Sequence, residues 1–262
     1  MAEIEIDGAP PGAGQLAALG LLNYGHFTTL RVEDGRVRGL GLHLDRLARD
    51  GRLLFGVEPD PAVVRERVRA VLPADGGPVV VRVTAYDPAL GVERPGAAAA
   101  PSLLVTTRAA AAAAPGPLRV RTTSYTRELP EVKHTGLFGL VRHRRLAQQD
   151  GYDDALLVDS VGRVTEGATW NIGFHDGRQL VWPEGDQLPG VTAALLAAAH
   201  SGPQRREPVR AADLGRFAVA FALNAGVGVR PIAAIDGTAF DPDHPVLAVL
   251  RQEYERIAAD EV

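Results

Sequence analysis

The sequence predicts an α+β protein built from two parts, and three observations support this prediction. Short β-branched runs alternate with segments of helical periodicity along all 262 residues, which favours strands and helices in both halves. Residues 108–117 join an alanine run to Pro-Gly-Pro without an amphipathic stripe, which is typical of a connection between domains. The length permits two small domains. We therefore predict domains over residues 1–107 and 118–262, joined by a linker at 108–117.

In the N-terminal part we expect a hairpin followed by two helices. Residues 28–32 predict a strand that returns through residues 36–38 after a turn at 33–35. Leucine and phenylalanine residues at helical spacing predict a helix over residues 43–55. A proline opens a second predicted helix over residues 61–72. Further predicted strands cover residues 79–85 and 103–107, with a loop rich in proline and alanine at 95–101 between them.

The C-terminal part is expected to hold a run of short strands joined by glycine turns, together with helices. Alternation and β-branched residues predict the strands, and helical spacing between proline or glycine boundaries predicts the helices. The predicted strands cover residues 118–123, 155–159, 163–165, 171–175, 179–181, 217–223 and 229–235. The predicted helices cover residues 137–149, 191–199 and 245–257.

The composition argues against several functional classes. Hydrophobic residues make up 46% and charged residues 23% of the chain, as in ordinary globular proteins. A net charge of -4 does not favour nucleic-acid binding, and no apolar stretch approaches membrane-spanning length. Cysteine is absent and the seven histidines lack metal-ligand spacing. The acidic start lacks the features of a signal peptide, so we expect a cytoplasmic protein without a metal, a nucleic-acid partner or a membrane span.

The most informative residue is Lys133, the only lysine in the chain. All other members of the 28 Lys and Arg residues are arginines. A lysine amine can lose its proton and form a Schiff base with a carbonyl, whereas a guanidinium stays protonated. A general bias toward arginine explains a single lysine equally well, so the other motifs decide the interpretation.

Four further motifs match the needs of one cofactor, pyridoxal 5′-phosphate (PLP). Glu166 precedes a glycine at a strand end, residues 190–192 open a helix, residues 224–228 form a glycine-rich loop, and Arg46 lies on a helix. Taken singly, each has an ordinary explanation as a turn, a helix cap or a surface charge. Taken with Lys133, they supply an amine for the Schiff base, a carboxylate for the pyridine nitrogen, and cationic and amide groups for the phosphate.

In their order along the chain, these motifs resemble those of the fold-type IV PLP enzymes. This group contains branched-chain aminotransferases, D-amino acid aminotransferases and aminodeoxychorismate lyases. The resemblance implies a small N-terminal α/β domain, a larger C-terminal domain that is a mixed β-barrel with helices, and a homodimer. The similar segments cover residues 24–32, 43–47, 132–134, 154–159, 164–167, 171–172, 188–192 and 228–232.

The resemblance also implies a role for each site residue. Lys133 would form the Schiff base and later move the proton, Glu166 would pair with the pyridine nitrogen, and Arg46 would bind the phosphate. Further phosphate contacts are implied for Val191, Thr192 and the turn Asn224, Ala225 and Gly226. Ala225 stands where the transaminases carry a hydroxyl residue, so a contact there is expected from the backbone or from a neighbour.

The activity that we expect is a class IV aminotransferase, which moves an amino group between an amino acid or amine and a keto acid. The alternative is the aminodeoxychorismate lyase reaction, which releases pyruvate and uses the same residues. Lyases and D-amino acid enzymes carry a Thr/Ser-Arg-Gly segment at a strand end, whereas residues 83–87 here contain no arginine. Arg82 is a candidate replacement, and Tyr24, Phe27 and Trp170 are further candidates for the substrate side. A non-catalytic relative is a less favoured class, because the set of Lys133, Glu166 and Arg46 is intact, and a metal hydrolase is less favoured still.

Overall fold

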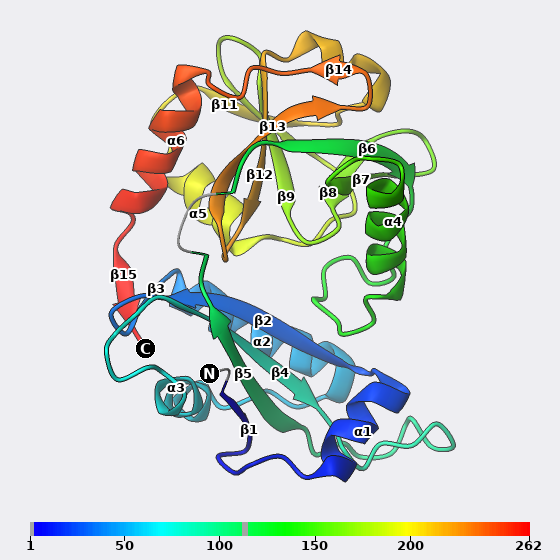
Figure 1. Cartoon of the computed structure of the whole chain (residues 1–262). Coiled ribbons are helices and arrows are strands. Elements are labelled where there is room, and N and C mark those ends of the chain that lie inside the picture. Colours follow the sequence, from blue (N-terminus) through cyan, green and yellow to red (C-terminus); the bar gives the residue numbers. More distant parts are fainter. Residues whose placement is uncertain (1–2, 112–114) are drawn as a thin grey trace. The chain divides into compact units, whose positions relative to one another are not determined.

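The computed structural model describes residues 3–111 and 115–262, which form two compact units (Figure 1). Residues 112–114 of the predicted linker, and the first two residues of the chain, lie outside the described residues. Each unit combines segments that are distant in the sequence. Unit 1 comprises Met1–Ala110, Val132–Gly136 and Ala258–Val262, and unit 2 comprises Ala111–Glu131 and Leu137–Ile257.

Unit 1 is an antiparallel sheet with helices packed on it. The strand order is β1-β5-β4-β2, so β2 is an edge strand with β4 on one side. Leu47 of α2, Val68 of α3 and Val83 of β4 belong to one buried apolar cluster, which places both helices against the sheet. The elements are β1 (Ile4–Ile6), α1 (Ala13–Leu22), β2 (Gly25–Val32), β3 (Arg36–Arg38), α2 (Leu40–Phe55), α3 (Pro61–Ala70), β4 (Val79–Tyr86), β5 (Ser102–Ala109) and β15 (Ala259–Glu261).

Local sequence signals account for the boundaries of these elements. Asp34 and Gly35 both have positive φ angles, 51° and 69°, as a tight hairpin turn between β2 and β3 requires. The carboxylate of Asp60 accepts a hydrogen bond from the backbone N–H of Ala62 at 2.8 Å, and Pro61 follows it at the first helical position of α3. Gly56 ends α2 with a φ of 69°.

Unit 2 is a curled sheet in the order β11-β10-β9-β12-β13-β6-β7-β8, with β14 paired to β13. A tight turn joins the end of β8, the last strand of this order, to the start of β9. In this turn the backbone N–H of Gly167 donates to the carbonyl of Trp170 at 2.8 Å. The strands are β6 (Leu118–Ser124), β7 (Asp154–Val158), β8 (Val164–Gly167), β9 (Asn171–His175), β10 (Leu180–Pro183), β11 (Gln204–Glu207), β12 (Val219–Asn224), β13 (Gly228–Ile235) and β14 (Thr238–Ala239).

The helices of unit 2 cover the outer face of this sheet, and its inner face is filled by a separate apolar core. Leu196 of α5 and Leu250 of α6 pack with Phe221 of β12 on the outer face. On the inner face, Phe174 stacks on Phe217 with 4.5 Å between the ring centroids. The helices are α4 (Phe138–Gln149), α5 (Val191–Ala199) and α6 (Pro245–Arg256), with a 3₁₀ helix at Ala211–Arg216.

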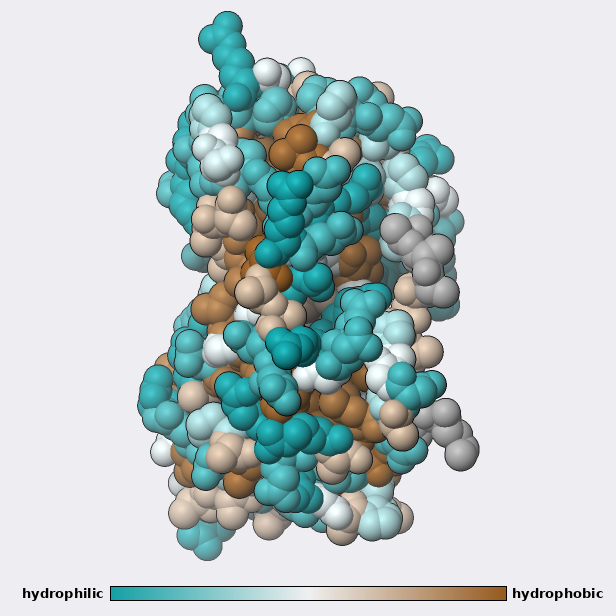
Figure 2. Space-filling view, turned by 90° about the vertical axis from the view of Figure 1, so that its left-hand side faces the viewer, coloured by the Kyte–Doolittle hydropathy of each residue, from teal (hydrophilic) through white to brown (hydrophobic). Residues whose placement is uncertain are grey.

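The predicted α+β class with a curled, barrel-like C-terminal sheet is confirmed, and the predicted strands and helices are present with end shifts of a few residues. Among the described residues, six elements were not predicted: α1, β1, β11, the 3₁₀ helix Ala211–Arg216, β14 and β15. Hydrophilic side chains dominate the face shown in Figure 2, with hydrophobic patches between them. Among the described residues, no helix is both long enough and apolar enough to cross a membrane.

Candidate functional site

Lys133 lies in a short segment, Val132–Gly136, that belongs to unit 1 although its sequence neighbours on both sides belong to unit 2. The segment runs antiparallel to the start of β2, with a bridge between His26 and His134. The N–H of Phe27 donates to the carbonyl of Lys133 at 2.9 Å, and the N–H of Thr135 donates to the carbonyl of Gly25 at 2.8 Å. The edge of β2 therefore fixes the backbone at the sole lysine.

The amine of Lys133 and a guanidinium lie against the same aromatic ring. Its Nζ lies 4.9 Å from the centroid of Phe27, and the Cζ of Arg82 lies 3.6 Å from the same centroid. The Nε of Arg82 donates to the hydroxyl of Thr84 at 3.1 Å, and burial lowers the pKa of Arg82. Two of the predicted substrate residues, Phe27 and Arg82, thus lie together beside Lys133. Another of the four, Tyr24, packs edge-on against Phe55 with 5.5 Å between the centroids.

One face of α2 contributes His43, Arg46 and Asp50 to the same region of unit 1. All three side chains are buried. His43 Nδ1 and the hydroxyl of Thr28 share a hydrogen bond of 2.7 Å. Burial, together with the positive charges of Arg46 and Lys133, lowers the pKa of His43 to about 3, so its imidazole is neutral near pH 7. Arg46 and Lys133 both lie close enough to His43 for their charges to affect its imidazole.

In unit 2, Glu166 is buried at the end of β8 and pairs with Arg127. Nη1 of Arg127 donates to Oε1 of Glu166 at 3.2 Å, and both side chains are about 5% exposed. A buried carboxylate needs such a partner, because its desolvation is costly. At the next residue, Gly167, a Cβ atom would lie 2.0 Å from the indole of Trp170, so only glycine lets that ring lie against the backbone.

The N-terminus of α5 has the features of an anion site. Gly190 precedes the helix without a side-chain cap, and a Cβ atom there would lie 1.7 Å from Oδ1 of Asn171. Thr192 is 2% exposed, and its hydroxyl oxygen has no hydrogen-bond partner among the described residues. Free N–H groups and the helix dipole favour an anion at this position, and the hydroxyl of Thr192 adds a donor.

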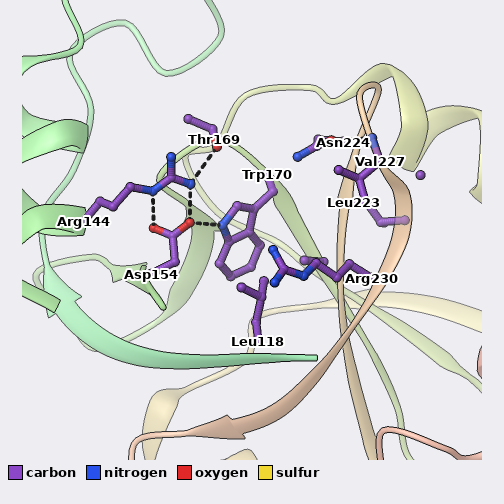
Figure 3. A pocket seen from close by; sticks show the side chains of 11 residues that line it. Leu118, Arg144, Asp154, Thr169, Trp170, Leu223, Asn224, Val227 and Arg230 are labelled. Carbon is purple, nitrogen blue, oxygen red and sulfur yellow. Dashed lines mark hydrogen bonds and ion pairs between the residues drawn. The ribbon is translucent and has the colours of Figure 1, made fainter. Parts of the chain in front are cut away.

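The turn at residues 224–226 borders a small pocket inside unit 2 (Figure 3). Oδ1 of Asn224 accepts the N–H groups of Gly226 and Val227 at 3.0 Å each, which fixes the turn. Trp170 lies in the same pocket, and its indole N–H donates to Asp154 at 2.8 Å. The volume is about 60 Å³, and the lining residues are Leu118, Arg144, Asp154, Thr169, Trp170, Ala222, Leu223, Asn224, Val227, Gly228 and Arg230.

Sequence reasoning did not identify Asp50 or Arg127. Asp50 follows Arg46 by four residues on α2, so the two share a helix face, and this spacing was an available signal. Arg127 lies in the loop after β6 and reaches Glu166 across 39 residues. No local pattern marks such a pair.

The chain belongs to the amino-transferase class IV family, whose model matches residues 25–235. It is similar to a probable branched-chain-amino-acid aminotransferase of Rickettsia bellii, with 31% identity over 124 residues. That match covers 45% of this chain and 43% of the relative, so the chain spans less than half the length of the curated relative.

Solved structures share the fold over almost the whole chain. The fold IV transaminase CpuTA1 of Curtobacterium pusillum has 25% identity and a TM-score of 0.80, and the match covers 94% of this chain and 88% of that one. A hypothetical aminotransferase of Mycobacterium tuberculosis, in its PLP-bound form, has 20% identity, a TM-score of 0.78 and coverages of 96% and 97%. A putative 4-amino-4-deoxychorismate lyase of Legionella pneumophila has 21% identity, a TM-score of 0.80 and coverages of 96% and 97%.

Proposed function

We propose that this chain is a PLP-dependent aminotransferase that transfers an amino group between an amino acid and a keto acid, with Lys133 as the residue that binds the cofactor covalently. The observation that carries the proposal is the position of Lys133. It is the sole lysine, its backbone is fixed by β2, and its amine lies beside the desolvated guanidinium of Arg82 on the ring of Phe27. Membership of the class IV family supports the same reaction.

The site residues that the sequence predicts would hold the cofactor. Arg46, the amide of Val191 and the hydroxyl of Thr192 would bind the phosphate, and Glu166 would accept a hydrogen bond from the pyridine nitrogen. The fit is supported by the hydroxyl of Thr192, which is buried without a partner and needs one. The turn Asn224, Ala225 and Gly226 would add backbone contacts, since Ala225 offers no hydroxyl. When bound, PLP withdraws electrons from the substrate Cα atom and makes its proton acidic.

The residues of the chain then have separate tasks. The substrate amine would release Lys133 as a neutral amine, and its Nζ would take the proton from Cα as a general base. Arg82 would bind the substrate carboxylate through its terminal nitrogens. Phe27 and Tyr24 would line the apolar side of the substrate pocket, and Trp170 would support the strand end that carries Glu166. Arg127 would orient the carboxylate of Glu166.

The proposal is tested by mixing the PLP-loaded protein with a panel of L- and D-amino acids and following the absorbance of the bound cofactor. Conversion to the pyridoxamine form, reversed by a keto acid, is the expected result. Lys133→Arg keeps the positive charge but cannot bind PLP covalently, so it serves as the inactive control. Pyruvate release from aminodeoxychorismate without such conversion would show that the chain is a lyase. A protein that neither binds PLP nor reacts would contradict both.

We further propose that the active form is a homodimer in the cytoplasm. On α4, Phe138 is 79% and Val141 is 58% exposed, and the two lie on one helix face. A second copy of the chain would cover them, since exposed apolar clusters of this kind commonly mark interfaces. Light scattering of the purified protein tests the dimer, and a monomeric mass in an active sample would contradict it.

A further inference from the structure

Asp50 carries a buried charge that the proposed reaction does not use. It lies near the end of α2, and its side chain is 0% exposed. A carboxylate is among the most costly groups to remove from water unless its oxygens are paired and hydrogen-bonded. Its contacts therefore indicate why the position carries an aspartate.

The two carboxylate oxygens of Asp50 have different partners. Oδ1 accepts hydrogen bonds from Nε and Nη2 of the adjacent Arg49, at 2.9 and 2.7 Å. Oδ2 accepts the backbone N–H of Lys133 at 2.9 Å, from a residue 83 positions further along the chain. A hydrogen bond to an ionised acceptor is stronger than a neutral one, so this contact holds the backbone of Lys133 firmly.

The imidazole of His26 lies close enough to Asp50 to respond to its charge, but does not neutralise it. Burial lowers the pKa of His26 to about 4, against the opposing effect of Asp50. The ring is therefore neutral near pH 7, and neither ring nitrogen has a hydrogen-bond partner among the described residues. The hydrogen-bond partners of the Asp50 carboxylate are therefore Arg49 and the amide of Lys133.

Lys133 is thus held on both sides of its α-carbon. Asp50 binds its N–H, and the N–H of Phe27 binds its carbonyl at 2.9 Å. The same Phe27 places its ring under the lysine amine, 4.9 Å from Nζ. With both peptide groups fixed, the position of Nζ depends only on the torsions of the lysine side chain.

We propose that Asp50 is a positioning residue that fixes the backbone of Lys133, so that the amine reaches its reacting partner in one geometry. Arg49 orients the carboxylate, and the N–H of Phe27 completes the hold from the opposite side. The inference rests on the proposed role of Lys133 as the covalent anchor of the cofactor. A misplacement of about 1 Å at a reacting group can cost about 100-fold in rate, which sets the expected size of the effect.

The first test uses the unloaded wild-type protein and amide hydrogen exchange. The amide of Lys133 is expected to be protected, and the protection is expected to be lost in Asp50→Ala. Asp45→Ala is the matched control, because Asp45 is exposed on the same helix and its replacement should leave the exchange unchanged. A Lys133 amide that exchanges as fast as an open chain in the wild type, or equally slowly in both proteins, would overturn the proposal.

The second test measures how fast PLP becomes attached to Lys133, by borohydride reduction and mass spectrometry at successive times. We expect attachment and kcat to fall about 100-fold in Asp50→Ala, with KM nearly unchanged. Asp50→Asn keeps a neutral acceptor, so its attachment rate and kcat should lie between those of the wild type and those of Asp50→Ala. If the alanine variant does not fold, the asparagine variant provides the test. PLP attachment at the wild-type rate in Asp50→Asn would then overturn the proposal. A wild-type protein that never attaches PLP would contradict the proposed function instead, while the exchange test would still report on Asp50.

Discussion

At the scale of single residues, the surroundings of Lys133 support its proposed role more strongly than its being the sole lysine does. An amine and a guanidinium lie against the same ring of Phe27, and the guanidinium of Arg82 is partly removed from water. A desolvated cation attracts an anion strongly, because the local dielectric is low. We therefore propose that Arg82 distinguishes substrates that carry a carboxylate from plain amines.

Replacing Arg82 tests this distinction. In Arg82→Gln, kcat/KM for amino acids is expected to fall about 100-fold, the size of a lost charged hydrogen bond. A primary amine without a carboxylate should react as in the wild type. Arg108→Gln, at an exposed position on the neighbouring strand β5, is the control. Equal losses for amino acids and amines would show that Arg82 supports the structure only.

His43 predicts an acid-sensitive fold. Its pKa is about 3 in the folded protein, because of burial and then the charges of Arg46 and Lys133, against an ordinary value of 6.5. Below pH 6.5 the unfolded chain therefore binds more protons, so the free energy of unfolding falls as the pH falls toward 3. The slope is at most about 1.4 kcal/mol per pH unit for one such group. Urea unfolding between pH 5 and 7 should show a smaller slope in His43→Gln, and identical slopes would contradict this assignment.

At the scale of elements, the start of α5 combines an uncapped helix end with the unsatisfied hydroxyl of Thr192. Thr192→Val removes that oxygen and keeps the shape. We expect PLP to bind about 10-fold more weakly, because a hydrogen bond to a charged group is lost. The unloaded protein should lose no stability, since the hydroxyl has no partner to give up.

Thr165 provides the matched control for this variant. It is also buried, but its hydroxyl donates to the carbonyl of Leu157 at 3.2 Å. Thr165→Val is therefore expected to destabilise the fold by about 1 kcal/mol and to leave PLP affinity unchanged. Titration of PLP and thermal unfolding of the two variants give the comparison. Equal PLP affinities in both variants would show that Thr192 does not bind the phosphate.

Much of this element structure was predictable from the sequence. Proline and glycine boundaries marked α3 and α5, and β-branched runs marked the buried strands β4 and β5. The helix α1 was missed because its apolar residues surround the helix instead of forming one stripe, and none of them is buried. The strands β1 and β15 have three residues each, too few for a periodic signal, and they pair with distant partners.

Residues of the candidate site stood out in the sequence only where chemistry marks a residue type. Lys133, Glu166 and Thr192 stood out by their chemistry or their motif. Asp50 and Arg127 act through partners 83 and 39 residues away, and such pairings depend on the completed fold. The roles that we propose for them follow from these contacts and not from the sequence pattern around them.

At the scale of the whole molecule, both units are assembled from separate parts of the chain. The segment Ala258–Val262 follows α6 of unit 2 and returns to unit 1, where β15 pairs with β3. Val262 is buried in the apolar cluster of unit 1, and its carbonyl accepts a hydrogen bond from Arg69 at 2.9 Å. Val262 is therefore part of the core of unit 1.

Removing residues 258–262 tests this contribution. Loss of the buried valine and of the β15 pairing is expected to lower the stability of unit 1 by about 2–3 kcal/mol. The melting temperature should fall by several degrees, as measured by calorimetry. Val262→Ala should lower it by less, because the backbone pairing remains. A truncated protein with the same melting temperature as the wild type would show that the segment does not stabilise the core.

The central claim is that Lys133 holds PLP covalently, and borohydride reduction tests it most directly. Reduction would fix the cofactor to the amine, and digestion with mass spectrometry would locate it. Since the chain has one lysine, a side-chain adduct has only one possible position. We predict a single adduct on the peptide that contains Lys133, and none in Lys133→Arg. Bound PLP that leaves no adduct on Lys133, or the same adduct yield in Lys133→Arg, would contradict the claim.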